Sequence, residues 1–483
     1  MNGPAPFSVL HLTAELWPYA RTGGLGQAVA DLAAWQARSG LPVSVMMPLY
    51  RQVREEGTAL EPEGEPFTVN MAGDLLELRC WRAAGHRGGP TVLFLDHPPS
   101  FDRPAIYGEA SGDYADNARR FGIFCLGALE IAARAQGPRP VLHVHDWHAA
   151  LSIVYLRVTH AGRPELDRLP SVLTVHNGGF QGHFGFDTLA VLGLPSSLWA
   201  VDRMEWYGRL DLLKGGLTFA DMVTTVSPTH AIEVCTEVGG FGLHDVFQRL
   251  GDRFVGIRNG IDTLVWDPTT DREITARYGP DDLSGKPKCK AALQRAWSLP
   301  QRAHVPVFGM SARMVSQKGL DIILGSESLQ RADAQFVFLG AGEERYEQAL
   351  RALAAEQPHR IGVNTAFTDR LEHRLLAGAD FLLMPSLYEP CGLTQMRAQR
   401  YGALPLGRRV GGLADTITDG VTGFLFYDYT SDEFDRAVRR ALAVYGDQPL
   451  YLEHARAAMR RDFSWAEPAA QYREVYRRAL AAR

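Results

Sequence analysis

Short apolar runs alternate with longer amphipathic stretches along nearly the whole chain, and this alternation restricts the possible folds more than any other feature. A helical stripe from Phe121 to Ile131, with about 3.6 residues per turn, shows the amphipathic type. Strands that alternate with helices predict a doubly wound α/β fold with a parallel sheet. The apolar runs of the first half, each bounded by Gly, Pro, Asp or His, are 7–12, 42–47, 91–95, 141–144 and 171–175.

The same pattern starts again in the second half of the chain. Helical stretches at 318–329 and 344–356 lie between further apolar runs, which are 305–310, 335–339, 381–385 and 403–406. We therefore predict two α/β domains, with the boundary between Asn259 and Pro306. Since ligands bind at the carboxyl ends of parallel strands, the site is expected in a crevice between the two domains.

Composition excludes several classes of protein. The 483 residues include 50 Lys and Arg against 55 Asp and Glu, a net charge of −5 that argues against general binding to nucleic acid or anionic membranes. The five cysteines lie far apart without a Cys-x-x-Cys pair, so neither a disulfide framework nor a zinc knuckle is indicated. The sequence shows neither a signal peptide nor an apolar run of about 20 residues, the length that spans a membrane. We expect a soluble protein of the cytoplasm.

Polar motifs follow the predicted strands of the first half. The glycine-rich segment Arg21–Gly26 precedes a helix, an arrangement that suits a phosphate but is also typical of a tight structural turn. The fourth strand ends in His143-Val144-His145-Asp146-Trp147-His148, for which a metal site, a helix cap by Asp146 and a polar substrate site are alternatives. His176, at the end of the fifth strand, is either a ligand-binding residue or a core histidine.

The second half offers two cations and a carboxylate at strand ends. Arg313 and Lys318 lie five residues apart across a strand-to-helix turn, where they could neutralise a departing diphosphate or simply be a surface pair. Glu389 projects from a turn framed by Pro385 and Pro390, and a carboxylate there can hold sugar hydroxyls. Further glycines follow at 411–412.

Taken in order, these motifs resemble bacterial glycogen synthases and plant starch synthases, which are retaining glucosyltransferases of the GT-B fold. The resemblance covers nearly the whole chain, and its most specific motif is Glu389-Pro390-Cys391-Gly392-Leu393-Thr394-Gln395. It implies two Rossmann-like domains that face an interdomain cleft, with residues 1–260 on the acceptor side and 261–462 on the donor side. Residues 463–483 would form a terminal helix that crosses back to the first domain.

The resemblance also implies roles for individual residues. Asp146, His176, Arg313, Lys318 and Glu389 match catalytic positions. Tyr107 and Asp113 resemble the acceptor region. Donor-binding positions correspond to Arg21, Gly23, Gly24, Asn259, Arg313, Lys318, Phe367, Glu389, Cys391, Gly392, Leu393 and Thr394.

The implied reaction transfers glucose from ADP-glucose to the non-reducing end of an α-1,4-glucan such as glycogen, without a metal or pyridoxal phosphate. Consistent with this, the sequence contains no Asp-x-Asp motif. The chain departs from the family pattern at Arg21, where the family has lysine, and at Gln27, where it has aspartate. These departures leave open a UDP-glucose donor, a small-sugar acceptor or a non-catalytic glucan-binding homologue.

Overall fold

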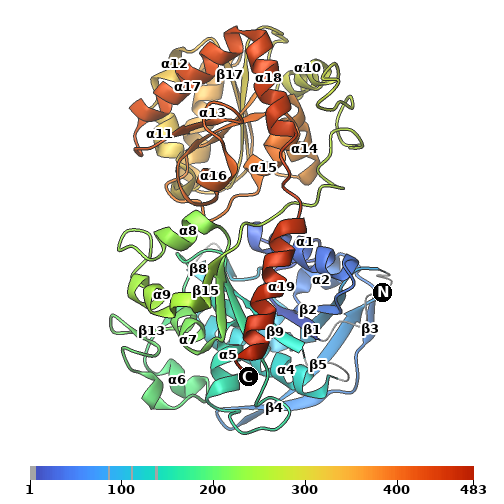
Figure 1. Ribbon diagram of the computed structural model, residues 1–483, viewed down its shortest axis with the longest axis vertical. Helices are drawn as coiled ribbons and strands as arrows, with labels where there is room; N and C mark the ends of the chain where they lie inside the picture. The colour runs from blue at the N-terminus through green and yellow to red at the C-terminus, as the bar shows by residue number, and fades with distance from the viewer. Residues whose placement is uncertain (1–6, 85–87, 110–111, 136–139) are drawn as a thin grey trace. The chain divides into compact units, whose positions relative to one another are not determined.

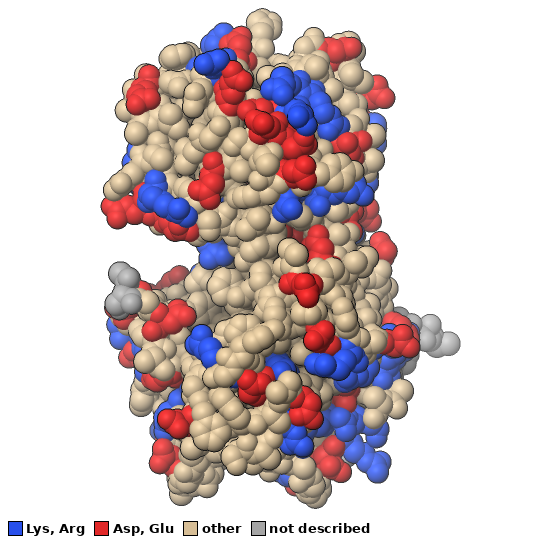
Figure 2. Space-filling model, turned by 90° about the vertical axis from the view of Figure 1, so that its left-hand side faces the viewer, with Lys and Arg blue, Asp and Glu red and all other residues tan. Residues whose placement is uncertain are grey.

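The computed structural model describes residues 7–84, 88–109, 112–135 and 140–483, which form two compact units (Figure 1). Unit 1 comprises residues 1–260 together with 465–483, and unit 2 comprises residues 261–464. No helix in the described part of the chain is long and apolar enough to cross a membrane. On the face drawn in Figure 2, Lys and Arg side chains are interspersed with Asp and Glu, as expected from the nearly balanced charge.

Unit 1 is built on a ten-stranded sheet in the order β15-β14-β10-β9-β1-β2-β6-β5-β3, with β4 paired to β5. Its strands are β1 (Ser8–Leu12), β2 (Val43–Pro48), β3 (Leu60–Pro62), β4 (Phe67–Met71), β5 (Asp74–Ala83), β6 (Thr91–Asp96), β9 (Pro140–His145), β10 (Ser171–Val175), β14 (Met222–Thr225) and β15 (Phe254–Gly256). From β15 to β6 neighbouring strands are parallel, as predicted. The antiparallel edge formed by β3, β4 and β5 was not predicted, because its strands alternate buried and exposed residues instead of forming apolar runs.

Helices cover this sheet, and the last of them comes from the far end of the chain. Helix α19 (Ala466–Ala481) packs on α1 (Gly24–Arg38) and on β9, β10 and β14. Tyr472 and Tyr476 of this helix are buried, and so is its N-cap residue Trp465. The other helices of unit 1 are α2 (Arg51–Glu55), α3 (Pro98–Phe101), α4 (Asn117–Arg134), α5 (Asp146–Arg157), α6 (Thr188–Val191), α7 (Leu212–Phe219), α8 (Pro228–Glu233) and α9 (His244–Leu250). Two small sheets, β7–β8 (Gly108–Glu109, Gly112–Asp113) and β11–β13 (His183–Phe184, Glu205–Trp206, Arg209–Asp211), complete the unit.

Unit 2 has a six-stranded sheet that is parallel throughout, in the order β18-β17-β16-β19-β20-β21. The strands are β16 (Val307–Ser311), β17 (Gln335–Leu339), β18 (Ile361–Asn364), β19 (Phe381–Met384), β20 (Leu404–Arg408) and β21 (Phe424–Phe426). The helices are α10 (Lys286–Ala296), α11 (Leu320–Leu324), α12 (Glu327–Arg331), α13 (Glu344–Glu356), α14 (Asp369–Gly378), α15 (Thr394–Arg400), α16 (Gly411–Thr416), α17 (Ser431–Gly446) and α18 (Gln448–Met459).

The single helix predicted at 318–329 is wrong. A short 3-10 turn at Ser316–Lys318 is separated from α11 by Gly319, whose φ of +77° is left-handed, and α12 begins separately after Ser326. A Cβ at Gly319 would lie 2.1 Å from the Pro385 carbonyl oxygen, so the chain needs glycine at this close approach.

In both sheets the strand order reverses at one point, which lies between β1 and β9 in unit 1 and between β16 and β19 in unit 2. At such a point the loops that follow two neighbouring strands diverge and leave room for a ligand at the carboxyl edge. Most of the motifs singled out in the sequence belong to the loops at these two edges.

Candidate active site

An ion pair connects the two loops at the strand reversal of unit 2. Lys318, in the loop after β16, places Nζ 2.6 Å from Oε2 of Glu389, in the loop after β19. The Ser386 hydroxyl donates to the same oxygen at 2.9 Å. Glu389 is 5% exposed. The structure thus brings together two residues that are 71 positions apart in the sequence, and it compensates a buried negative charge with an ammonium.

Backbone contacts fix the distance between these two loops. The Leu387 N–H donates to the Gln317 carbonyl at 2.8 Å, and Gln317 Nε2 donates to the Tyr388 carbonyl at 3.1 Å. Because these bonds join residues adjacent to the ion pair, the positions of Lys318 and Glu389 are set by the main chain as well as by their own attraction.

Arg313 belongs to the same loop as Lys318 but differs from it in its surroundings. Its side chain is exposed, and among the described residues its guanidinium has no hydrogen-bond or ion-pair partner. A guanidinium in this state can form bidentate hydrogen bonds with an anion without first breaking an internal ion pair.

The predicted glycine turn at 411–412 packs directly on the backbone of the Glu389 loop. A Cβ at Gly411 would lie 2.0 Å from the Glu389 carbonyl oxygen, and one at Gly412 would lie 2.0 Å from that of Cys391. The Gly412 N–H donates to the Glu389 carbonyl at 3.1 Å. These glycines therefore let the start of α16 approach the loop that carries the carboxylate.

The remaining donor positions of unit 2 lie at the same edge of its sheet. Gly392 adopts a φ of +71°, and Leu393 and Thr394 are half-buried at the start of α15. Cys391 is buried. Phe367 is 44% exposed in the loop after β18, just before Thr368, which caps α14.

In unit 1 the glycine-rich loop is held by Glu15, a buried residue that sequence reasoning missed. Its carboxylate accepts hydrogen bonds from the backbone N–H groups of Thr22 (2.7 Å) and Gly23 (3.1 Å), and from the Tyr107 hydroxyl (2.7 Å). The Gly23 amide, predicted to cradle a phosphate, already donates to this carboxylate. The sequence does show a carboxylate three residues after the end of a predicted strand. It does not show that the glycine-rich loop returns to this carboxylate.

The tandem glycines of this loop are not required by the packing of the chain itself. A Cβ at Gly23 or Gly24 would meet nothing within 4 Å, and neither residue has a positive φ. By contrast, a Cβ at Gly26 would lie 3.1–3.2 Å from atoms of Glu15, Leu16 and Arg21. Space is therefore kept open beside Gly23 and Gly24, as the close approach of a ligand requires.

Arg21 and Gln27, for which the sequence resemblance implies other residues in the family, contact each other. Arg21 Nη1 donates to Gln27 Oε1 at 3.3 Å, and Gln27 Nε2 donates to Asp31 Oδ1 at 2.8 Å. Gln27 accepts from a cation on one side and donates to a carboxylate on the other. Gln27 thus links the Arg21 guanidinium to the Asp31 carboxylate through two hydrogen bonds.

Asp146 and His176 lie at the carboxyl edge of the unit 1 sheet and are connected to each other. The His176 N–H donates to Asp146 Oδ1 at 2.7 Å, and burial raises the pKa of Asp146 to about 7. The helix-cap interpretation of Asp146 is wrong for α5, because its N-cap residue is His145 and the Asp146 carboxylate bonds to the neighbouring β10 loop instead. Asn259 is buried in the segment after β15.

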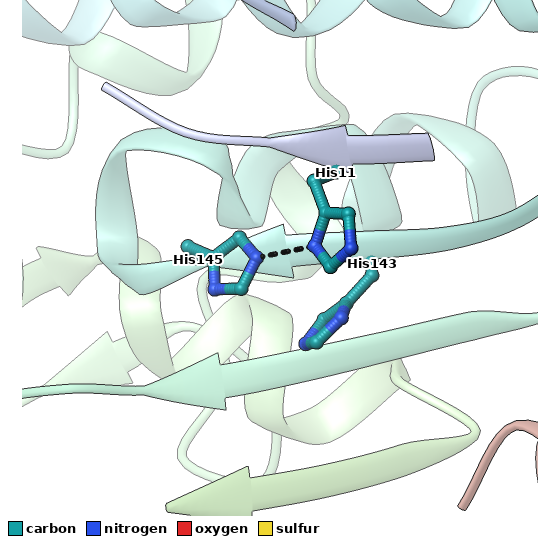
Figure 3. Close-up of side chains that lie close together, drawn as sticks. All are labelled: His11, His143 and His145. Carbon is teal, nitrogen blue, oxygen red and sulfur yellow. Dashed lines mark hydrogen bonds between the residues drawn. The ribbon is translucent and has the colours of Figure 1, made fainter. Parts of the chain in front are cut away.

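His143 and His145 of β9 lie on the same face of the sheet as His11 of the neighbouring strand β1, and the three rings lie close together (Figure 3). His11, His143 and His145 are fully buried and close enough to share a metal ion, a grouping that includes neither Asp146 nor His148. All six of their ring nitrogens have hydrogen-bond partners in the protein, however. A metal ion bound by these three residues would have to displace the hydrogen bonds at the nitrogens that it ligates.

The two predicted acceptor residues lie close together in the chain but differ in environment. Tyr107 donates to Glu15, and its ring stacks on His148 with centroids 4.7 Å apart. Asp113 is exposed in β8 and pairs with Gly108 of β7. Tyr107 therefore contacts Glu15, the residue that holds the glycine-rich loop.

Comparison with known proteins places this arrangement in one family. Residues 8–249 match the starch synthase catalytic domain, and residues 296–457 match the glycosyl transferases of group 1. The chain is 39% identical to glycogen synthase 2 of Geobacter sulfurreducens, over 98% of both chains. It is 40% identical to the glycogen synthase of Koribacter versatilis, over 96% of both chains. The chain belongs to the glycogen and starch synthase family.

Solved structures agree with this assignment. The catalytic domain of starch synthase IV from Arabidopsis thaliana, solved with ADP and acarbose, has a TM-score of 0.90 and 32% identity, covering 99% of this chain and all of that one. Sucrose-phosphate synthase from Thermosynechococcus elongatus, at 17% identity and a TM-score of 0.63, shares the fold. The chain is a glucosyltransferase of the glycogen synthase type with the two-domain GT-B α/β fold, as the resemblance predicted.

Proposed function

We propose that the chain transfers glucose from ADP-glucose to the non-reducing end of an α-1,4-glucan such as glycogen, with retention of configuration, in the cytoplasm. The observation that carries this proposal is the buried Glu389 carboxylate held by Lys318 at the strand reversal of unit 2, with the exposed Arg313 in the same loop. This combination suits a ligand with both a sugar and a diphosphate.

For the diphosphate, the proposal assigns two cations and the start of α15. Arg313 and Lys318 would stabilise the negative charge that develops on the leaving nucleotide, together with the amides of Leu393 and Thr394. Two side-chain cations can do this without a metal ion, and we propose a reaction that needs neither metal nor another cofactor. The ADP in the starch synthase IV structure is the nucleotide that ADP-glucose would leave behind.

For the glucosyl group, the proposal assigns Glu389 in unit 2 and Asp146 and His176 in unit 1. Glu389 Oε2 already accepts hydrogen bonds from Lys318 and Ser386, which suits a carboxylate that positions sugar hydroxyls and not one that attacks carbon. We therefore favour attack by the acceptor on the same face from which the nucleotide departs.

A panel of donors tests the substrate assignment. The full chain is incubated with glycogen and with ADP-, UDP- or GDP-glucose, and both the released nucleotide and the glucan length are measured. We expect ADP release with glucan elongation, and a kcat/KM for ADP-glucose well above that for the other donors. Preference for UDP-glucose, or hydrolysis without elongation, would contradict the proposal.

Substitution of Arg313 tests the diphosphate assignment. Loss of one charge-assisted contact costs about 1.5–3 kcal/mol, so Arg313→Ala should lower kcat/KM by about 10- to 150-fold. Arg331→Ala is the matched control, because Arg331 is an exposed arginine of α12 in a surface pair with Glu327. Activity of Arg313→Ala within twofold of wild type would remove this residue from the site.

A further inference from the structure

A continuous chain of hydrogen bonds runs through the buried core of unit 1, from the terminal helix to His176. Gln36 Nε2 donates to the Tyr476 hydroxyl at 2.8 Å, and Gln36 Oε1 is 2.8 Å from His11 Nε2. His11 Nδ1 is 3.0 Å from His145 Nε2, a bond drawn in Figure 3. His145 Nδ1 is in turn 3.0 Å from His176 Nε2.

The Gln36 amide determines which group donates and which accepts at each step of this hydrogen-bonded chain. An amide nitrogen only donates and an amide oxygen only accepts, whereas each neutral imidazole does one of each. With Gln36 Oε1 toward His11, Nε2 of His11 carries the proton and Nδ1 accepts from His145 Nε2–H. By the same rule His145 Nδ1 accepts, so the proton of His176 is on Nε2.

The three imidazoles of the chain are neutral, as this assignment requires. Burial lowers the pKa of His11 to about 4 and that of His176 to about 3, and it lowers the pKa of His145 well below its usual value. At neutral pH each ring therefore holds a single proton, and the only freedom left is which nitrogen carries it.

We propose that this chain fixes the tautomer of His176, with His11 and Tyr476 as positioning residues that act on the glucosyl-transfer site without touching the substrate. His176 is the half-exposed end of the chain, and with its proton on Nε2 it presents Nδ1 as an acceptor for a sugar hydroxyl. The role of the fixed tautomer rests on the proposed function, but the tautomer itself does not.

A second branch from Tyr476 provides an internal control. His143 Nδ1 is 2.9 Å from the Tyr476 hydroxyl, His143 Nε2 is 2.6 Å from Thr174 Oγ1, and Thr174 Oγ1 is 2.6 Å from Thr224 Oγ1. This branch is equally buried, and within the described part of the chain its hydrogen bonds reach Thr224 without joining the His176 ring. Thr224→Val removes one buried hydroxyl, as Tyr476→Phe does, and should destabilise unit 1 by a similar amount. It leaves the hydrogen bonds from Tyr476 to His176 intact.

Nitrogen-15 spectra of the full chain labelled at histidine test the proposal without substrate. The His176 signals are assigned by their loss in His176→Gln, and wild type should show a protonated Nε2 and an unprotonated Nδ1 at pH 7.5. His11→Phe and Tyr476→Phe should each shift these signals toward a mixture of tautomers, whereas Thr224→Val should not. A proton on Nδ1 in wild type, or unchanged signals in both His11→Phe and Tyr476→Phe, would overturn the proposal.

Activity and metal content complete the test. We expect kcat/KM to fall at least fivefold in His11→Phe and Tyr476→Phe and to stay within twofold in Thr224→Val. If the purified protein contained one equivalent of zinc, and His11→Phe lost it, the histidines would form a metal site. That result would overturn the proposed hydrogen-bonded chain. If wild type fails to use any nucleoside diphosphate glucose, the proposed function is wrong. The tautomer measurement still tests whether the hydrogen-bonded chain fixes the proton of His176.

Discussion

At the scale of single residues, one buried carboxylate in each unit differs from the other in its surroundings. Glu389 faces the Lys318 ammonium, so its charge is compensated within the chain. Asp146 accepts hydrogen bonds from backbone N–H groups, but burial outweighs these bonds and raises its pKa to about 7. Asp146 is therefore a carboxyl group of unit 1 whose charge changes near neutral pH.

The raised pKa of Asp146 predicts a pH dependence of stability. Folding binds a proton at this group, so its contribution is fully present below the unfolded value of 3.8 and is lost as pH rises to about 7. At about 1.4 kcal/mol per pH unit, the loss is about 4 kcal/mol. Asp146→Asn should remove this dependence, and asparagine tolerates the positive φ of +56° at this position.

Urea unfolding of unit 1 between pH 4 and 8 measures this difference. Wild type should lose stability relative to Asp146→Asn as pH rises from 4 to 7, with the gap constant above about pH 8. Parallel curves over the whole range would mean that the Asp146 carboxyl titrates as in water.

The aspartate that the sequence resemblance implies at position 27 is incompatible with the hydrogen bonds that Gln27 forms in this chain. In Gln27→Asp, a carboxylate would replace the amide that donates to Asp31, and two negative groups would meet where both residues are buried. We expect a loss of about 1–3 kcal/mol in the stability of unit 1. The double variant Gln27→Asp with Asp31→Asn restores an amide–carboxylate contact and should recover most of this loss in thermal unfolding. Equal stability of the single and double variants would contradict this account.

At the scale of elements, the start of α16 supports the loop that carries Glu389. In Gly412→Ala the new Cβ would meet the Cys391 carbonyl oxygen, a backbone atom that cannot move away without displacing the loop. We expect kcat/KM to fall more than tenfold and unit 2 to lose about 1–3 kcal/mol. Gly446→Ala, at the end of α17 with open space around it, is the matched control and should be neutral or stabilising. Wild-type activity of Gly412→Ala would refute the role of α16.

The elements also show what the sequence could and could not predict. Parallel strands were found because both of their faces are buried, so they appear as apolar runs. The break at Gly319 was missed because a left-handed residue leaves the helical periodicity intact around it. The contact of Lys318 with Glu389 depends on the pairing of β16 with β19, which no local pattern encodes. The support of the glycine-rich loop by Glu15 has the same origin, since it arises only when the loop folds back.

At the scale of the whole molecule, unit 1 is discontinuous in the sequence and unit 2 is inserted into it. The chain leaves unit 1 after Gly260 and returns at Trp465. The two ends of unit 2 are joined, because the Ile261 N–H donates to the Phe463 carbonyl at 2.8 Å. Unit 2 therefore has a complete sheet, and its first and last residues lie close together. Residues 1–260, by contrast, lack α19, the helix that covers part of the unit 1 sheet.

This arrangement predicts that the fragments behave differently. Residues 261–464 alone should fold and unfold cooperatively. Residues 1–260 alone should be severely destabilised, because α19 buries Trp465, Tyr472 and Tyr476, each at most 1% exposed and each contributing about 1.5–3 kcal/mol. Fusing 465–483 to 1–260 through a short flexible linker should restore folding, measured by calorimetry and amide exchange. A fusion that carries Tyr472→Ala and Tyr476→Ala is the control, since it restores the chain length without the buried rings. Stable folding of 1–260 by itself would show that α19 serves only the hydrogen-bonded chain to His176 and not the core of unit 1.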